Sequence, residues 1–153
     1  MTLFESFQQA LADFGEKMGM QLALNENRCN FTVDGTVEVE IDYIEEAEEV
    51  VAWSPVGYAV EDGFQEQRAR ALMELNELDA KNAGFTISMD PENRMVVVHD
   101  HHPAEMFENA DHVAAWIDSL VELVNGIRTR FEEQFPCGDL PDDMDEYETS
   151  EEQ

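Results

Sequence analysis

The most constraining feature of the sequence is a run of alternating apolar and polar residues on both sides of Asp34-Gly35. An Asp-Gly pair favours the tight turn of a β-hairpin, because both residues tolerate the positive φ angles that this turn requires. Every second residue on each side is apolar, so one face of the hairpin is apolar and the other is polar and acidic. The apolar positions are Cys29, Phe31, Val33, Val37, Val39, Ile41 and Tyr43. The pattern predicts an antiparallel sheet with one buried face.

Shorter patterns on either side extend this sheet. Leu22 and Leu24 precede a turn-forming cluster at 25–27 and predict a strand that pairs with the one starting at Cys29. A third strand is expected over residues 50–53, resuming at 57–60, with Pro55 favouring a sheet edge or a bulge. Residues 85–89 and 95–98 predict a second hairpin. Its continuous apolar return strand indicates burial on both faces, either under a helix or at a subunit interface.

Three segments repeat their apolar residues at the period of an α-helix. In residues 3–18 the spacing is three or four, Thr2 and Glu5 form a capping-box pattern, and Gly19 suits the end of the helix. A second helix is expected over residues 65–82, and a third begins between residues 103 and 111 and extends to Phe131. The order helix, three strands, helix, two strands, helix predicts an α+β fold with an antiparallel, twisted sheet packed by helices.

Acidic residues limit the classes of partner. The 153 residues include 36 Asp plus Glu against 8 Lys plus Arg, for a net charge of -28. Such a surface repels phosphate backbones and anionic membranes, so neither nucleic acid nor a membrane is expected as a partner. With 43% hydrophobic residues, the chain has enough apolar material for one folded domain over residues 1–135. Residues 136–153 hold eight acids and no base, and a disordered acidic tail is expected there.

The N-terminal residues and the cysteines indicate a reducing compartment. The first residues have neither the basic start nor the apolar run of a secretory signal. No apolar segment approaches the roughly 20 residues that span a bilayer. Cys29 and Cys137 lie far apart and form no disulfide framework, so both are expected to be free thiols. We expect a cytoplasmic protein.

Residues suited to metal binding or catalysis are sparse. On a strand, His99 and His101 would project to the same side, as a chelating pair must, and His102 follows them. No Cys or Glu-x-x-His spacing completes a metal site around them. Acidic pairs such as Glu45 and Glu46 accompany no Gly-rich phosphate loop, nucleophile elbow or EF-hand spacing. We therefore expect no metal, no cofactor and no enzymatic activity.

Apolar residues outnumber those that three helices and two small hairpins would bury in one layer. The first helix alone contributes three Phe, and Trp53 lies near the strand that contains Pro55. One reading is that all of these residues are core. The other, favoured by the excess as a whole, is a homodimer with a peptide-binding surface.

The spacings and the order of elements resemble those of the class I type III secretion chaperones, the Tir-chaperone-like family. In the first half the resemblance rests on Leu11, Phe14-Gly15, Met18-Gly19, Leu22, Leu24-Asn25-Glu26-Asn27, Cys29, Phe31 and Val33-Asp34-Gly35. In the second half it rests on Leu75-Asn76, Gly84-Phe85, Ile87, Met89-Asp90, Arg94-Met95-Val96-Val97, Phe107 and Trp116. The similarity covers about residues 3–133 and contains no catalytic signature.

The resemblance implies a homodimeric, cytoplasmic chaperone that hydrolyses no nucleotide. Such a protein binds the extended N-terminal region of a type III secreted effector and keeps it soluble and export-competent. In this family the dimer forms through the second helix and the strands after it, which correspond here to Leu72, Leu75, Leu78, Phe85 and Ile87. The effector lies on the first helix and the sheet and pairs with strand edges. The corresponding positions are Phe4, Phe7, Leu11, Phe31, Val33, Val39 and Trp53.

Two segments depart from the family pattern, namely residues 99–102 and the acidic extension after Phe135. A second hypothesis therefore remains open. In it, the chain is a non-catalytic regulatory or protein-interaction domain of similar fold that binds a folded partner or acts as an acidic decoy.

Overall fold

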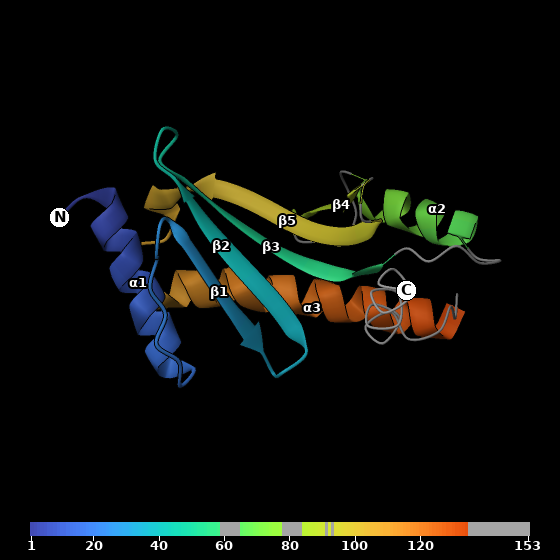
Figure 1. Cartoon of the computed structure of the whole chain (residues 1–153), viewed down its shortest axis with the longest axis horizontal. Helices are drawn as coiled ribbons and strands as arrows, with labels where there is room; N and C mark the ends of the chain where they lie inside the picture. The colour runs from blue at the N-terminus through green and yellow to red at the C-terminus, as the bar shows by residue number, and fades with distance from the viewer. Residues whose placement is uncertain (59–64, 78–83, 91, 93, 135–153) are drawn as a thin grey trace, which may run out of the picture. The chain divides into compact units, whose positions relative to one another are not determined.

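The computed structural model describes residues 1–58, 65–77, 84–90, 92 and 94–134. In chain order its elements are α1 (Leu3–Lys17), β1 (Arg28–Val33), β2 (Val37–Ile44), β3 (Glu49–Tyr58), α2 (Gln65–Leu75), β4 (Thr86–Asp90), β5 (Met95–Pro103), the short 3-10 helix η1 (Ala104–Met106) and α3 (Ala110–Gln134) (Figure 1). The strands form one sheet in the order β1-β2-β3-β5-β4. The predicted α+β fold and the predicted order of elements are confirmed.

The chain divides into two compact units. The first, residues 1–54 and 99–122, contains α1, β1, β2, the first part of β3, the end of β5, η1 and the first half of α3. The second contains the end of β3, α2, β4, the first part of β5 and the second half of α3. The predicted tail lies outside the described residues, and the single domain over residues 1–135 stays a prediction.

The hairpin of β1 and β2 has the predicted turn and the predicted buried face. Asp34 and Gly35 have φ angles of 53° and 71°, and the Thr36 N–H donates to the Val33 carbonyl at 3.1 Å. Phe31 lies opposite Val39 in the antiparallel register, and both side chains are buried. Residues between the buried ones are exposed or half-buried along both strands. Period-two alternation therefore placed each side chain on the expected face.

Helix α1 covers this apolar face. Its capping box is present, since the Glu5 N–H donates to the Thr2 hydroxyl oxygen at 3.1 Å. The ring of Phe14 lies 6.0 Å from that of Phe31, and the ring of Phe7 lies 6.1 Å from that of Tyr43. Burying each such side chain contributes about 1.5–3 kcal/mol, so these contacts hold the helix on the sheet.

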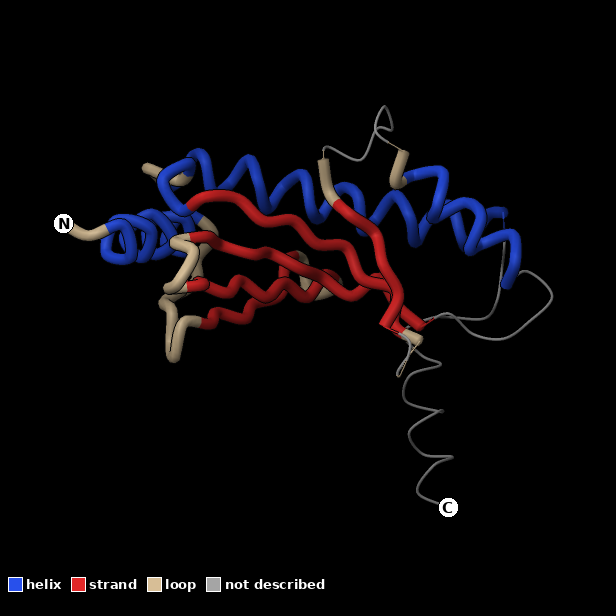
Figure 2. Tube along the Cα trace, turned by 90° about the horizontal axis from the view of Figure 1, so that it is seen from above, coloured by secondary structure: helices blue, strands red, loops and turns tan. Residues whose placement is uncertain are grey.

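The first half of α3 joins the same core through aromatic rings. Phe107 stacks on Trp116 with 4.5 Å between ring centroids, and Phe107 also packs edge-on against Phe7 at 6.0 Å. In Figure 2 this half of the helix runs alongside the strands of the first unit. Among the described residues, no helix is long and apolar enough to cross a membrane.

The strand predicted at Leu22 and Leu24 is absent. This segment packs against α1 and is hydrogen-bonded to it, since the Leu24 N–H donates to the Gln8 side-chain oxygen at 3.2 Å. Leu22 is buried against Gly15, where a Cβ would lie 2.8 Å from Leu22 Cγ. The segment of Leu22 and Leu24 thus packs on the helix instead of pairing with β1. The one exception is an isolated β-bridge between Asn25 and Arg28.

Strand β3 also differs from its prediction. It is continuous through Pro55 and lies between β2 and β5 in the strand order, so it is not an edge strand as a whole, but its register with β2 ends at Trp53, before Pro55. Arg128 of α3 donates to two carbonyls at this point, with Nε at 2.9 Å from the Val56 oxygen and Nη2 at 3.2 Å from the Pro55 oxygen. A side chain from a helix therefore satisfies backbone groups around Pro55.

Two elements of the second unit differ in part from their predictions. Helix α2 ends at Leu75, and residues 78–82 of the longer predicted helix lie outside the described part. In β5, Val96 and Val98 are buried while Met95 and Val97 are half-buried. One face of this strand is thus fully covered within a single chain, and burial of the other face at a subunit interface stays a prediction.

Candidate functional site

Strand β1 forms one edge of the sheet and exposes backbone groups there. The Tyr43 N–H donates to the Asn27 carbonyl at 2.8 Å, which fixes the odd-numbered residues of β1 as those that bond to β2. The N–H and C=O of even-numbered residues point away from β2. The N–H and C=O of Arg28 are both hydrogen-bonded to the backbone of Asn25 in the preceding turn. Within the described residues Asn30 and Thr32 have no such partner, so the edge is open at these two positions.

A cavity of about 310 Å³ adjoins this edge. Its lining comprises Gln21, Leu22, Ala23, Asn25, Arg28, Cys29 and Asn30. Cys29 is a free, buried thiol, as predicted, while Cys137 lies outside the described residues. Burial raises the pKa of the Cys29 thiol, and a hydrogen bond from the Ala23 backbone opposes this rise. The thiol therefore serves as an apolar part of the wall and not as a nucleophile.

The side of the hairpin away from α1 carries polar and aromatic side chains, and we call it the outward face. It consists of Arg28, Asn30 and Thr32 on β1, Glu38, Glu40 and Asp42 on β2, and Val51 and Trp53 on β3. Trp53 Nε1 donates to Glu40 Oε2 at 2.8 Å. Arg28 Nε lies 3.1 Å from Asp42 Oδ1 and 3.5 Å from Glu40 Oε2. The guanidinium of Arg28 thus forms ion pairs with the carboxylates of both Glu40 and Asp42.

Glu40 is the most enclosed acid of this group. Its side chain is 16% exposed, against 25% for Asp42 and 62% for Arg28. Burial raises the pKa of the Glu40 carboxyl, and neighbouring Asp42 adds to the rise. The hydrogen bond from Trp53 and the charge of Arg28 oppose it. The surroundings of Glu40 therefore disfavour its charged form, even though Trp53 and Arg28 both interact with the carboxylate.

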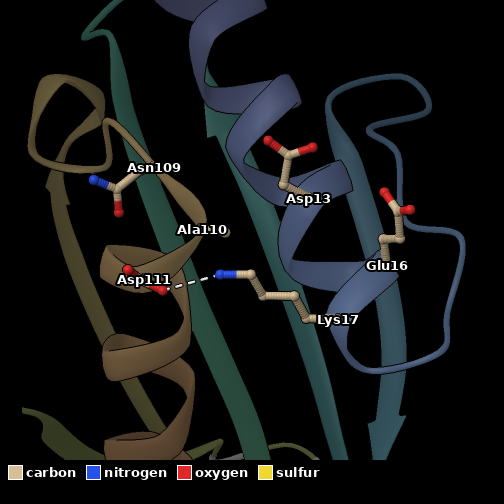
Figure 3. Close-up of a pocket in the computed structure, with 6 residues that line it drawn as sticks. All are labelled: Asp13, Glu16, Lys17, Asn109, Ala110 and Asp111. Carbon is tan, nitrogen blue, oxygen red and sulfur yellow. Dashed lines mark hydrogen bonds and ion pairs between the residues drawn. The ribbon is translucent and has the colours of Figure 1, made fainter.

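A second cavity, of about 460 Å³, lies where α1 ends and α3 begins (Figure 3). It is lined by Asp13, Glu16, Lys17, Asn109, Ala110 and Asp111. Lys17 extends from α1 to Asp111, with 3.0 Å between Nζ and Oδ1. Both partners are more than half exposed, and such surface pairs contribute about 0–1 kcal/mol. None of the residues that line this cavity belongs to a strand.

Of the three histidines at the end of β5, His102 takes part in packing. Asp100 Oδ2 accepts from Trp116 Nε1 at 3.0 Å and pairs with His102 Nε2 at 2.7 Å. The His102 ring packs edge-on against Trp116 at 6.0 Å. His99 and His101 alternate with these residues and point to the other side of the strand. In the described part of the chain no three ligand-type residues come together as a metal site.

The seven positions predicted for effector binding divide between two environments. Phe7, Leu11, Phe31, Val33 and Val39 are buried in the core between α1 and the hairpin. Phe4 is half-buried and packs edge-on against Tyr43 at 5.1 Å, and Trp53 is half-buried on the outward face. Periodicity identified the apolar faces correctly but gave no sign that Asn30 and Thr32 lie at an open edge. Polar residues at alternate positions did not mark the edge either, because β2, an inner strand, carries them as well.

The positions predicted for the dimer lie in the second unit. Leu72, Phe85 and Ile87 are buried, Leu75 is half-buried, and Leu78 lies outside the described residues. Near them, Met73 is 75% exposed and Met89 is 43% exposed. Helix α2 and strand β4 thus combine a buried apolar base with exposed methionines. Sequence reasoning did not single out these methionines.

The sequence matches the model of the Tir chaperone protein (CesT) family over residues 9–128. A comparison with curated proteins gives no significant match. The fold is similar to a chain in the ExsC–ExsE complex, with a TM-score of 0.69, 17% identity, and coverage of 91% of this chain and 100% of that one. At these identities, structural likeness is evidence for the fold alone.

Two further solved structures show the same likeness. A chain of the HopA1–SchA chaperone–effector complex gives a TM-score of 0.62 and 18% identity, covering 78% of this chain and 91% of that one. A chain in the structure of the Yersinia pestis type III secretion chaperone SycH in complex with a stable fragment of YscM2 gives a TM-score of 0.61 and 16% identity, covering 79% of this chain and 98% of that one.

Proposed function

Because the chain belongs to the Tir chaperone protein (CesT) family, we propose that it is a cytoplasmic, non-enzymatic chaperone for a type III secreted effector. It binds the extended N-terminal region of the effector and keeps that region soluble and export-competent. The single observation that carries this proposal is the open edge of β1 at Asn30 and Thr32, beside a cavity of about 310 Å³. Solved chaperone–effector complexes share the fold.

The effector segment adds a strand to β1 in this proposal. Asn30 and Thr32 together offer two N–H donors and two carbonyl acceptors along the edge. Each backbone hydrogen bond contributes about 0.5–1.5 kcal/mol net. Backbone pairing makes little demand on the sequence of the partner, while pockets for alternate side chains add selectivity. The cavity beside Cys29 and Leu22 is placed to receive one such side chain, and four of its seven lining residues are polar.

The proposed effector contacts include Phe4 and Trp53, whose rings are partly exposed. Phe7, Leu11, Phe31, Val33 and Val39 support that surface from beneath, because they are buried in the single chain. The proposed homodimer forms through α2 and β4, where Met73 and Met89 present apolar surface next to Leu72, Leu75, Phe85 and Ile87. Residues 1–135 act as one domain and residues 136–153 as an acidic tail.

Co-expression with effectors encoded near the gene tests the function, and Thr32→Pro tests the site. Proline removes the outward N–H of Thr32 but leaves the bonds between β1 and β2 intact, because an edge strand tolerates it there. We expect effector co-purification to fall by about tenfold or more, the equivalent of one or two lost hydrogen bonds. Thr32→Ala keeps the N–H and is the matched control.

Three outcomes would contradict the proposal. Unchanged capture by Thr32→Pro would remove the β1 edge as the binding site. Proteolysis of the complex provides the second outcome: a partner bound through a folded domain, without a protected extended segment, would indicate the regulatory protein-interaction domain instead. An effector that neither co-purifies nor gains solubility would withdraw the chaperone role.

A further inference from the structure

We propose that the open edge of β1 pairs, in antiparallel orientation, with the same edge of a second copy of this chain, and we call this contact self-pairing. The inference rests on the proposed function in one respect, since an effector strand and a second copy would compete for a single edge. Self-pairing itself needs only the geometry of β1. It is separate from the proposed homodimer, because α2 and β4 lie in the second unit and β1 lies in the first.

The open stretch of β1 is symmetric about Phe31. At one end, Asn25 bonds to both backbone groups of Arg28, at 2.9 and 3.2 Å, and so occupies the place of a further strand. At the other end the chain turns away at Asp34, whose φ angle is 53°. Residues 29–33 remain between these limits. A two-fold axis at Phe31 therefore places the open stretch of one copy opposite the whole open stretch of the other.

This register uses every open backbone group of the edge. Asn30 lies opposite Thr32 of the partner subunit, and Thr32 lies opposite Asn30 of the partner subunit. Each pair exchanges two hydrogen bonds, because the even-numbered residues point away from β2. Any other register with these groups would bring in Arg28, which is bonded to Asn25, or Asp34 in the turn. Such a contact is small beside a standard interface, so we expect self-pairing to be weak and reversible.

The side chains of β1 suit a copy of β1 although the chain as a whole is acidic. Residues 29–33 contain no charge and no proline, which are devices that keep natural strand edges from pairing. Among the strands that the structure describes, β1 alone contains neither Asp nor Glu. Asn30 and Thr32 are exposed and uncharged, so no like charges meet across the two pairs.

The acids beside this edge lie too far apart to prevent the contact. Glu40 faces Asn30 and Glu38 faces Thr32 from β2. Three strand spacings of about 4.8 Å would therefore separate the acids of one copy from those of the other. This separation exceeds the Debye length of about 8 Å in physiological salt, so their repulsion is largely screened.

Disulfide cross-linking between two variants tests the register. Asn30→Cys and Thr32→Cys are each made in the full chain with Cys137→Ser, then mixed in oxidised glutathione. Opposing Cα atoms of such a pair lie about 5.5 Å apart, which a disulfide can bridge. The same position on two copies lies on the diagonal, about 7–8 Å apart. We expect the mixture to give at least about fivefold more covalent dimer than either variant alone.

The collision control mixes Asn30→Cys with Glu46→Cys, since Glu46 is exposed in the turn between β2 and β3. Both variants again carry Cys137→Ser. A yield from the Asn30 and Thr32 mixture that is no higher than this control would overturn the inference.

Two double variants test the contact without a cross-link. Asn30→Lys with Thr32→Glu places opposite charges in both pairs, and Asn30→Lys with Thr32→Lys places like charges there. In sedimentation velocity over a range of concentrations, we expect association to be about tenfold weaker for the two-lysine variant. Net charge predicts the reverse order, because added lysines reduce the repulsion between chains of charge -28. Equal association of the two variants would contradict self-pairing.

Unfolding cannot explain that expected loss. In the two-lysine variant the new side chains face Glu40 and Glu38, and opposite charges across neighbouring strands stabilise a sheet. Urea denaturation should therefore show the two-lysine variant to be at least as stable as the variant with Thr32→Glu.

Failure of this inference is distinguishable from failure of the proposed function. If Thr32→Pro blocks effector capture while the mixture of cysteine variants gives only the collision yield, the effector site stands and self-pairing falls. If the mixture cross-links but effector capture survives Thr32→Pro, self-pairing stands and the effector site on β1 falls.

Discussion

The side-chain amide of Asn76 pairs with both backbone groups of Ile87. Asn76 Oδ1 accepts from the Ile87 N–H at 2.8 Å, and Asn76 Nδ2 donates to the Ile87 carbonyl at 2.6 Å. Ile87 belongs to β4, an edge strand of the sheet, so the amide takes the place that another strand would occupy. Unpaired edges invite association with other chains. Asn76 closes β4 at this residue, whereas β1 is open at Asn30 and Thr32.

The first prediction concerns this closure. Asn76→Ala removes both bonds and should lower the free energy of unfolding by about 1–3 kcal/mol, measured by urea denaturation. It should also increase self-association in light scattering, because the Ile87 backbone becomes available. Glu77→Ala, at the exposed neighbouring position, is the control and should change neither quantity. Equal stability of the two variants would show that the amide contributes nothing.

The second prediction concerns a close approach in the first unit. A Cβ at Gly15 would lie 2.8 Å from Leu22 Cγ and 2.9 Å from the Met20 carbonyl oxygen. Gly15→Ala should therefore destabilise the chain by about 1–3 kcal/mol, as overpacking does. Gly126→Ala on α3 meets no atom within 4 Å and should stabilise it by up to about 1 kcal/mol. Thermal unfolding that moves both variants in the same direction would contradict this.

The third prediction follows from the raised pKa of Glu40. The folded chain binds the proton of the Glu40 carboxyl more tightly than the unfolded chain does. The contribution of Glu40 to the free energy of unfolding therefore falls as pH rises above about 4.3, the ordinary glutamate pKa. Glu40→Gln cannot lose a proton. Its stability relative to the native chain should therefore increase between pH 4 and pH 7 in urea titrations. Comparison with Glu46→Gln corrects for the change in net charge, and a difference that shrinks with rising pH would refute the prediction.

The fourth prediction tests the proposed dimer. Met73 is 75% exposed on α2, so Met73→Asp should leave the fold intact while placing a charge in the proposed interface. We expect light scattering to report a shift from dimer to monomer. Met18→Asp changes a methionine that is 46% exposed in the first unit and should leave the mass unchanged. If only Met18→Asp dissociates the protein, the interface lies elsewhere.

The fifth prediction concerns the proposed tail. Deletion of residues 136–153 removes eight acids and should shift the melting temperature by no more than a degree or so, about what surface changes within 0.5 kcal/mol produce. Calorimetry of the shortened chain is the measurement. A fall of many degrees would show that this segment packs on the domain.

Local patterns predicted the elements that local physics governs. The hairpin of β1 and β2 follows from period-two alternation and one Asp-Gly turn, and the start of α1 follows from Thr2 and Glu5. The errors arose where distant contacts decide. Leu22 and Leu24 alternate like a strand, yet Gly15 and Gln8 hold them against α1. Pro55 favoured an edge or a bulge; the register of β3 with β2 ends at Trp53, and Arg128, far along the chain, satisfies the carbonyls of Pro55 and Val56.

The sequence by itself determined which residues are apolar on one face of each element, because side-chain periodicity and turn chemistry act between near neighbours. Only the tertiary structure decided which strand lies at an open edge and which edge is closed. The pairing of Asn76 with Ile87, and the row from Asn30 through Glu40 to Trp53, join different elements. The local Asp-Gly turn fixed the register of Asn30 with Glu40, but strand order and the pairing of Asn76 with Ile87 depend on contacts between separate elements, which no local pattern encodes.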